Sequence, residues 1–180
     1  RLREEVESLL KGLRPYFREF REEILKTEGE AQKHAVYKLN LLATYTKKRC
    51  VLFLKSEESG RIALEDLEMA SSEICSALRA FRLHAAIDWK MPDEMPAQTA
   101  LLAFDALTTF LAEAARSRAA EDIYVTMAEA RVTFLVEQQG AWLARWQALW
   151  HDGHAASRTA VKDLGYAVSV DCSLTEEVKR

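Results

Sequence analysis

The residues best suited to binding a metal ion stand together late in the chain, as the trio His151, Asp152 and His154. Imidazole and carboxylate groups are zinc ligands, and a structural zinc site takes four of them. The trio surrounds Gly153, which predicts a turn, and it has no fourth ligand beside it. The pattern is therefore a weak indication of a metal, and we expect none at this place.

Thiol chemistry has no better support. The cysteines are far apart, odd in number and outside any Cys-x-x-Cys pair; they are Cys50, Cys75 and Cys172. Neither a disulfide framework nor a zinc site fits these spacings. We expect reduced, half-buried thiols in a cytoplasmic protein.

One aromatic and one basic cluster each allow two interpretations. Trp142, Trp146 and Trp150 recur at four-residue spacing. Their rings could stack on a nucleotide base, but such a stripe more often belongs to a core or an interface. The run Lys47-Lys48-Arg49 could meet an acidic partner, but a basic run on a helix is more often a solvated face. We favour the structural interpretation of both clusters.

Composition excludes several classes of protein. The chain has 180 residues, 49% of them hydrophobic, which is enough for one good core and a smaller appended element. It has no apolar run of membrane-spanning length and no signal peptide, so we expect no direct membrane insertion. A net charge of −3 gives no general attraction to nucleic acid. Because the sequence begins at Arg1 rather than at methionine, we expect a piece of a longer protein.

An antiparallel helical hairpin is predicted over residues 1–56. Two apolar stripes with helical period, from Leu2 to Ile24 and from Ala35 to Phe53, flank the helix breaker Gly29. Each arm is about 37 Å long at 1.5 Å per residue, and two such helices cannot bury both apolar faces alone. We therefore expect a homodimer through residues 1–56, in the form of a four-helix bundle. Pro15 should kink or divide the first arm.

The centre of the chain predicts a helix packed on a β-hairpin. Residues 96–117 carry one apolar face with helical period. Asp122–Ala128 and Arg131–Gln138 then alternate apolar and polar residues, which is typical of an antiparallel pair with one buried face.

The flanking segments complete an α+β sandwich. Before the centre we expect a third helix from Ala63, a strand at His84–Lys90 and a loop at Met91–Pro96. After it we expect a tryptophan-rich segment at 141–150, a break at Asp152-Gly153, a short helix at His154–Leu164 and a strand at Tyr166–Asp171. This order predicts helices on one face of a mixed sheet.

The order of elements resembles the transmitter module of bacterial sensor histidine kinases. That module is a dimerising helical hairpin followed by an ATP-binding domain of the histidine-kinase/gyrase/Hsp90 type. Four segments resemble its motifs: Ile62–Leu67 the start of the first helix, Phe110–Ser117 the box that contains an asparagine, Glu137–Gly140 the Asp-x-Gly turn, and Gly153–Arg158 with Leu164-Gly165-Tyr166 the closing glycine-rich segment. The resemblance implies a hairpin domain over residues 1–58 and an ATPase-like sandwich over 62–180, truncated at its C-terminal end.

The same resemblance implies an eroded nucleotide site. Its residues would be Glu113, Gln138, Gly140 and Gly153. In active members an asparagine helps to hold Mg²⁺ on the phosphates, and Glu113 stands in its place; it could bind the cation, but its charge repels a triphosphate. Gln138 replaces the aspartate that accepts a hydrogen bond from adenine, and an amide accepts it less strongly. Binding of ATP and Mg²⁺ is expected to be weak.

The position of the phosphorylated histidine is also altered. Arg14-Pro15-Tyr16-Phe17 resembles an Asn-Pro-His-Phe motif whose histidine attacks the γ-phosphate. Tyr16 occupies that position, and a phenol with a pKa near 10 cannot replace a neutral nitrogen nucleophile. His34, on the second arm, is a weak alternative because Lys33 and Ala35 flank it instead of an acidic residue.

Two functions of different classes follow from the resemblance. The first is the cytoplasmic transmitter fragment of a divergent two-component sensor histidine kinase, acting in signal transduction with a response regulator as partner. The second is a catalytically inactive dimeric histidine-phosphotransfer or scaffold protein that does not bind ATP.

Overall fold

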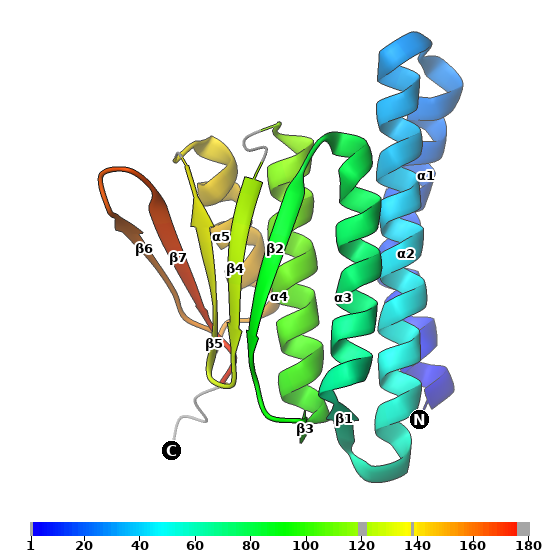
Figure 1. Cartoon of the computed structure of the whole chain (residues 1–180). Coiled ribbons are helices and arrows are strands. Elements are labelled where there is room, and N and C mark those ends of the chain that lie inside the picture. The colour runs from blue at the N-terminus through cyan, green and yellow to red at the C-terminus, as the bar shows by residue number, and fades with distance from the viewer. Residues whose placement is uncertain (1, 119–121, 138, 176–180) are drawn as a thin grey trace.

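The computed structural model describes residues 2–118, 122–137 and 139–175, and the elements lie in three layers (Figure 1). The outer layer is a helical hairpin, α1 (Leu2–Lys26) and α2 (Gly29–Ser59). The middle layer holds α3 (Leu64–Leu78), α4 (Ala97–Arg116) and α5 (Ala141–Gly153). The third layer is a sheet, so the predicted α+β sandwich behind a helical hairpin is confirmed.

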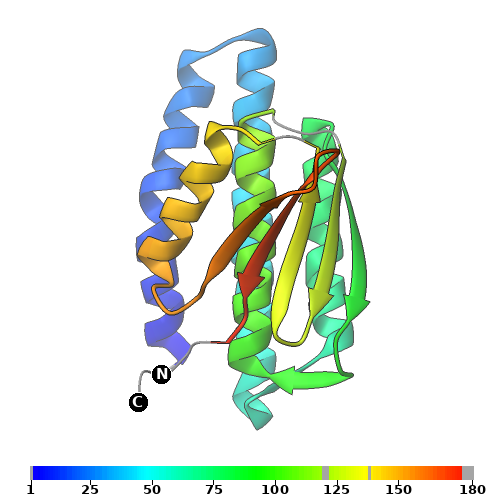
Figure 2. The same ribbon diagram turned by 90° about the vertical axis from the view of Figure 1, so that its left-hand side faces the viewer.

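The main sheet is mixed and has five strands in the order β2-β4-β5-β7-β6. These strands are β2 (His84–Lys90), β4 (Asp122–Ala128), β5 (Arg131–Val136), β6 (Thr159–Asp163) and β7 (Val168–Ser173). β2 and β4 are parallel, whereas the other neighbours are antiparallel. Burial alternates along β4, β5 and β7, as expected when helices cover only one face (Figure 2).

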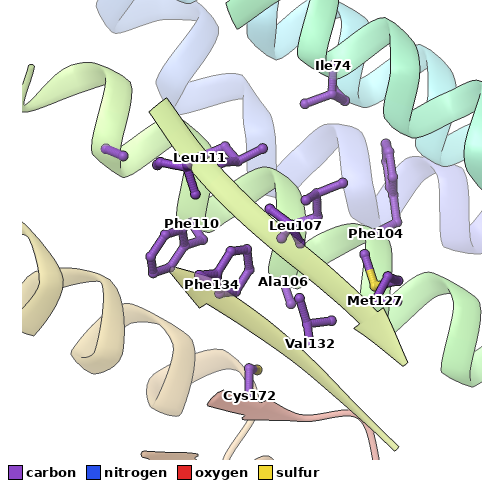
Figure 3. Packing of buried hydrophobic residues seen from close by; sticks show 14 of the residues in the cluster. Ile74, Phe104, Ala106, Leu107, Phe110, Leu111, Met127, Val132, Phe134 and Cys172 are labelled. Atoms are coloured by element: carbon purple, nitrogen blue, oxygen red, sulfur yellow. The ribbon is translucent and has the colours of Figure 1, made fainter. Parts of the chain in front are cut away.

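The core lies between α4 and the sheet. Phe110 of α4 stacks on Phe134 of β5 with ring centroids 3.8 Å apart, and both rings are fully buried (Figure 3). Leu107 and Leu111 share that face of the helix and are also fully buried. The apolar period seen in residues 96–117 is thus the period of this contact.

Local boundaries follow from single residues. Gly60 ends α2 in the left-handed conformation, with φ of 69°, and its N–H donates to Ser56 O. Pro15 lies inside α1 without dividing it, so that part of the expectation is wrong. α5 extends to Gly153, so the helix includes Asp152 and Gly153, the two residues that were expected to break it.

Two further expectations about secondary structure are wrong. Residues 94–96 form a short strand, β3 (Glu94–Pro96), which pairs with β1 (Arg61–Ala63). Residues 159–163 form the edge strand β6 rather than part of a helix. Three-residue strands are too short for a pattern to show, and β6 is exposed along most of its length, so it lacks the alternation of a half-buried strand.

One face of the hairpin packs on the rest of its own chain. Leu41 and Leu52 of α2 are buried and belong to the same core as α3 and α4. The expectation that too little chain is available to cover the apolar faces is therefore wrong for this face of α2. On α1, by contrast, Phe20 is the one buried side chain among the described residues, and it is 8% exposed.

A buried carboxylate joins the hairpin to the sandwich. Asp105 of α4, 9% exposed, accepts hydrogen bonds from Tyr45 Oη at 2.7 Å and from Arg49 Nε at 3.0 Å, both on α2. A second guanidinium nitrogen of Arg49 lies 3.2 Å from the other carboxylate oxygen. Burial, then the charge of Asp105, raises the pKa of Tyr45 above its ordinary value, so the phenol remains a donor.

The basic run on α2 is largely used inside the chain. Lys48 Nζ lies 2.8 Å from a carboxylate oxygen of Glu73 on α3, and only Lys47 of the run is exposed. The interpretation of this run as a solvated face is therefore wrong for Lys48 and Arg49.

Replacing Asp105 with alanine should lower the free energy of unfolding by about 3 kcal/mol, because it leaves a half-buried guanidinium and a buried phenol without their acceptor. Tyr45→Phe should cost only about 1 kcal/mol, because the ion pair survives. Urea unfolding followed by circular dichroism measures both.

The matched control is Asp88→Ala, which removes an exposed aspartate 3.5 Å from Lys90 and should change stability by less than about 1 kcal/mol. An Asp105→Ala variant as stable as this control would contradict the role given to the buried carboxylate.

Candidate functional site

Glu113 lies on the last turns of α4, on the side of the helix that faces α5. Its side chain is almost fully buried, and Oε1 accepts a hydrogen bond from Arg145 Nε of α5 at 3.1 Å. The same guanidinium donates to Ser117 Oγ at 3.0 Å. The charge of Glu113 is thus compensated by a residue that the sequence did not single out, because the two partners are 32 positions apart.

Aromatic rings fill the space between α4, β5 and α5. Trp142 and Trp146 of α5 meet Phe110 edge-on, with centroids 5.3 and 5.0 Å away, and both are buried. Trp146 Nε1 donates to Thr109 Oγ1 at 3.1 Å, which satisfies its one polar atom. Trp150, the third member of the tryptophan stripe, is buried as well. The interpretation of the stripe as core is therefore confirmed, and none of the three indole rings is free to stack on a ligand.

Gly140 is the residue that precedes α5, and it has extended backbone. A Cβ atom there would lie 2.8 Å from Trp142 Cδ1, closer than side-chain carbons approach one another. The glycine therefore allows the indole of Trp142 to lie against the backbone. The structural role of Gly140 is to leave room for the indole ring of Trp142.

The other glycine of the predicted site is at the far end of the same helix. Gly153 ends α5 twelve residues after Ala141, or about 18 Å away at 1.5 Å per residue. The two glycines therefore do not surround one ligand-sized space. Gln138 lies outside the described residues.

The two candidate phosphoacceptors lie in different surroundings. Tyr16 is 45% exposed and lines the same pocket as Glu113, on the α1 side. His34 instead meets Phe81 edge-on, with centroids 5.2 Å apart, and its Nε2 is buried with no hydrogen-bond partner among the described residues. Burial, then the charge of Lys38, lowers the pKa of His34, so its imidazole is neutral at pH 7.

The trio near the end of α5 is divided among other contacts. His151 Nε2 lies 3.0 Å from Thr159 Oγ1, while the ring of His154 stacks on Trp150 at 3.9 Å. Within the described residues no three His, Cys, Asp or Glu side chains come together as metal ligands. Among all the described residues, no helix is both long enough and apolar enough to cross a membrane.

Replacing each of the two glycines with alanine should change stability in opposite directions. Gly140→Ala should destabilise the protein by about 1–3 kcal/mol, because the new methyl group forces Trp142 to move. Gly153→Ala should raise stability by up to about 1 kcal/mol, because it adds a better helix former where nothing lies within 4 Å of the new carbon. Thermal unfolding measures both, and tryptophan fluorescence should shift only in Gly140→Ala. Equal effects of the two substitutions would contradict the packing of Trp142 on Gly140.

No protein-family model matches this chain, and no curated protein matches it in sequence.

Solved structures do match it. The blue-light activated histidine kinase EL346 of Erythrobacter litoralis is 14% identical with a TM-score of 0.50, and the match covers 81% of this chain and 58% of that one. A structure of the histidine kinase domain of the same protein is 13% identical with a TM-score of 0.48, over 87% of this chain and 93% of that one. A bacterial phosphotransferase is 11% identical with a TM-score of 0.43, over 93% and 95%.

At 14% identity the likeness to EL346 concerns the fold, and this chain spans 58% of the length of that kinase. The chain therefore has the α+β fold of a sensor histidine kinase, with long N-terminal helices followed by a mixed five-stranded sheet covered by helices.

Proposed function

We propose that this chain is the transmitter part of a divergent two-component sensor histidine kinase, acting in signal transduction, in which α5 has closed the nucleotide site. On this proposal the hairpin and the sandwich carry the signal as a conformational unit. The partner is a response regulator, and the module acts in the cytoplasm, alone or as part of a membrane-bound sensor.

The observation that carries the proposal is the way in which α5 packs on α4. Glu113, which the sequence resemblance makes the nearest counterpart of the asparagine of active kinases, is bound by Arg145. Trp142 and Trp146 pack edge-on against Phe110, three residues before Glu113 on α4. A phosphate group brought between α4 and α5 would have to displace the ion pair of Glu113 and the two buried indoles, and burying large rings is worth about 2–3 kcal/mol each.

A second candidate function is retained binding of Mg·ATP. The observation that favours it is the carboxylate of Glu113 itself, because a hard cation binds oxygen ligands and could bridge to phosphates. The two candidates differ in a single measurement, since only the second gives saturable nucleotide binding.

Titration with a fluorescent ATP analogue and Mg²⁺ should give no saturable binding by the unmodified chain up to millimolar nucleotide. Glu113→Asn should not restore it, because the indoles of α5 remain in place. If the site were open and only the charge of Glu113 kept nucleotide away, the same variant would bind more tightly by about 1–2 kcal/mol, or roughly ten-fold.

Glu129→Asn is the matched control, since it removes one exposed carboxylate outside the site. Saturable binding by the unmodified chain that Glu113→Ala abolishes would establish the second candidate instead. Acid-labile label from γ-labelled ATP, lost in His34→Ala, would return the chain to the active kinases with an acceptor on α2.

Dimerisation through residues 1–56 is part of the same proposal. With one face of α2 covered by α3 and α4, a second copy must meet the opposite side of the hairpin. Val36 and Leu54 are exposed there, 44% and 49%, and their spacing of five helical turns puts them on one face of α2. Leu10 of α1 is also exposed.

Val36→Asp combined with Leu54→Asp should convert a dimer to a monomer in light scattering, because two charges would be buried without partners. The control is Met69→Asp, which places the same charge on an exposed apolar residue of α3 and should leave the dimer intact. A dimer that persists in the double variant would place the interface elsewhere.

A further inference from the structure

A pocket lies where the hairpin meets the sandwich. Glu113 and Tyr16 of the candidate site are among the residues that line it, but the signalling function proposed above assigns it no ligand. Its walls come from α1, α2, α4 and α5 and from the short 3-10 helix at Arg79–Phe81. The volume is about 290 Å³. A cavity of about 150 Å³ holds benzene, so this pocket has room for one aromatic ring with a short side chain.

Aromatic and leucine side chains make up the apolar part of the walls. Tyr16 and Phe20 line the pocket from α1, Tyr45 from α2, and Phe81 from the 3-10 helix. Edge-to-face and offset contacts between rings add to the burial of apolar area. This lining favours an apolar ligand over a strongly polar one, and the four aromatic side chains give a ring specific partners.

One polar atom in the wall is left without a partner. Thr108 of α4 is 5% exposed, and its hydroxyl has no hydrogen-bond partner among the described residues. An unpaired buried hydroxyl is costly, so a ligand group that bonds to it gains more than the same group would gain in water. Thr108 is thus the wall residue with which a hydroxyl or carbonyl of the ligand would bond, once the ligand displaces the groups that now cover its hydroxyl.

Among the described residues, the ion pairs around the pocket leave one cation for the ligand. Glu113 is bound by Arg145, and Lys38 Nζ lies 3.1 Å from a carboxylate oxygen of Glu23. Arg116, eight residues after Thr108 on the same face of α4, has no ion pair within the described residues. Its guanidinium suits a carboxylate about two helical turns, or roughly 12 Å along the axis, from the threonine.

We propose that this pocket binds a small aromatic monocarboxylate that carries a hydrogen-bonding group on the far side of its ring. The carboxylate pairs with Arg116, the ring lies among the aromatic side chains, and the distal group bonds to Thr108 Oγ1. Because the ligand contacts both the hairpin and α4, it binds only the folded arrangement and raises the midpoint of thermal unfolding.

Three related probes separate the contributions: 3-(4-hydroxyphenyl)propionate, the same acid without its hydroxyl, and the corresponding neutral alcohol. Isothermal titration and ligand-detected NMR should show saturable binding of the hydroxylated acid, in the micromolar to millimolar range expected for so small a ligand. The alcohol should bind about ten-fold more weakly.

Each variant removes one interaction. Arg116→Gln should weaken the acids about ten-fold and leave the alcohol unchanged. Thr108→Val should weaken only the hydroxylated acid, by about five-fold, and should leave stability the same or higher because it removes an unpaired polar atom. Ala112→Phe, which fills the pocket, should abolish binding of every probe, whereas Ala86→Phe on the exposed side of β2 should not.

No saturable binding of the hydroxylated acid by the unmodified chain would overturn the proposal, as would binding that survives Ala112→Phe. An alcohol that binds as tightly as the acid would overturn the assignment of Arg116. None of these results depends on ATP or on dimerisation, so the pocket and the signalling function can fail separately.

Discussion

The buried carboxylate of Asp105 is the constraint on which the arrangement of hairpin and sandwich depends. A carboxylate that is nine-tenths buried must be paired, and both of its partners, Tyr45 and Arg49, stand one turn apart on α2. A shift of α2 by one residue along α4 would turn both donors away by about 100°. The interaction therefore fixes the rotation and height of the hairpin more than it adds to stability, since buried ion pairs gain little over apolar packing.

The position of α2 decides what each surface of the hairpin can do. Its inner face, with Leu41 and Leu52, is part of the main core, so the hairpin is continuous with the sandwich instead of hanging from it. α1 reaches the sandwich less closely, and a pocket remains between its aromatic side chains and α4. The outer side of the hairpin keeps exposed apolar residues such as Leu10 and Val36. The buried contact of Asp105 with α2 thus decides which face of the hairpin packs on the sandwich and which face stays exposed.

The sequence predicts the parts of this fold whose signal is local. His84–Lys90 and Asp122–Ala128 are correct to the residue, because half-buried strands alternate in sequence whatever they pair with. Thr159–Asp163 was missed because an edge strand takes its state from its neighbour: Val161 lies opposite Val170, which no local pattern reveals. In the site, Glu113 was singled out by its position in a motif. Arg145, which decides its electrostatics, was not, because an ion pair between two helices leaves no mark on the spacing of either residue.

The same distinction between local and packed signals bears on what happened to the nucleotide site. A charge at position 113 is a one-residue change, whereas the approach of α5 to α4 involves several buried rings and a glycine that admits one of them. Only residues 137–140 connect β5 to α5, which leaves little chain for a phosphate-binding loop. On the proposed function, the buried rings of Trp142 and Trp146 fill the space beside α4 that a nucleotide would otherwise occupy, so the fold is stable without a ligand. On the same proposal, one change therefore explains both the eroded motifs and the retained fold. Aromatic side chains of the core fill the space in which a nucleotide would otherwise bind.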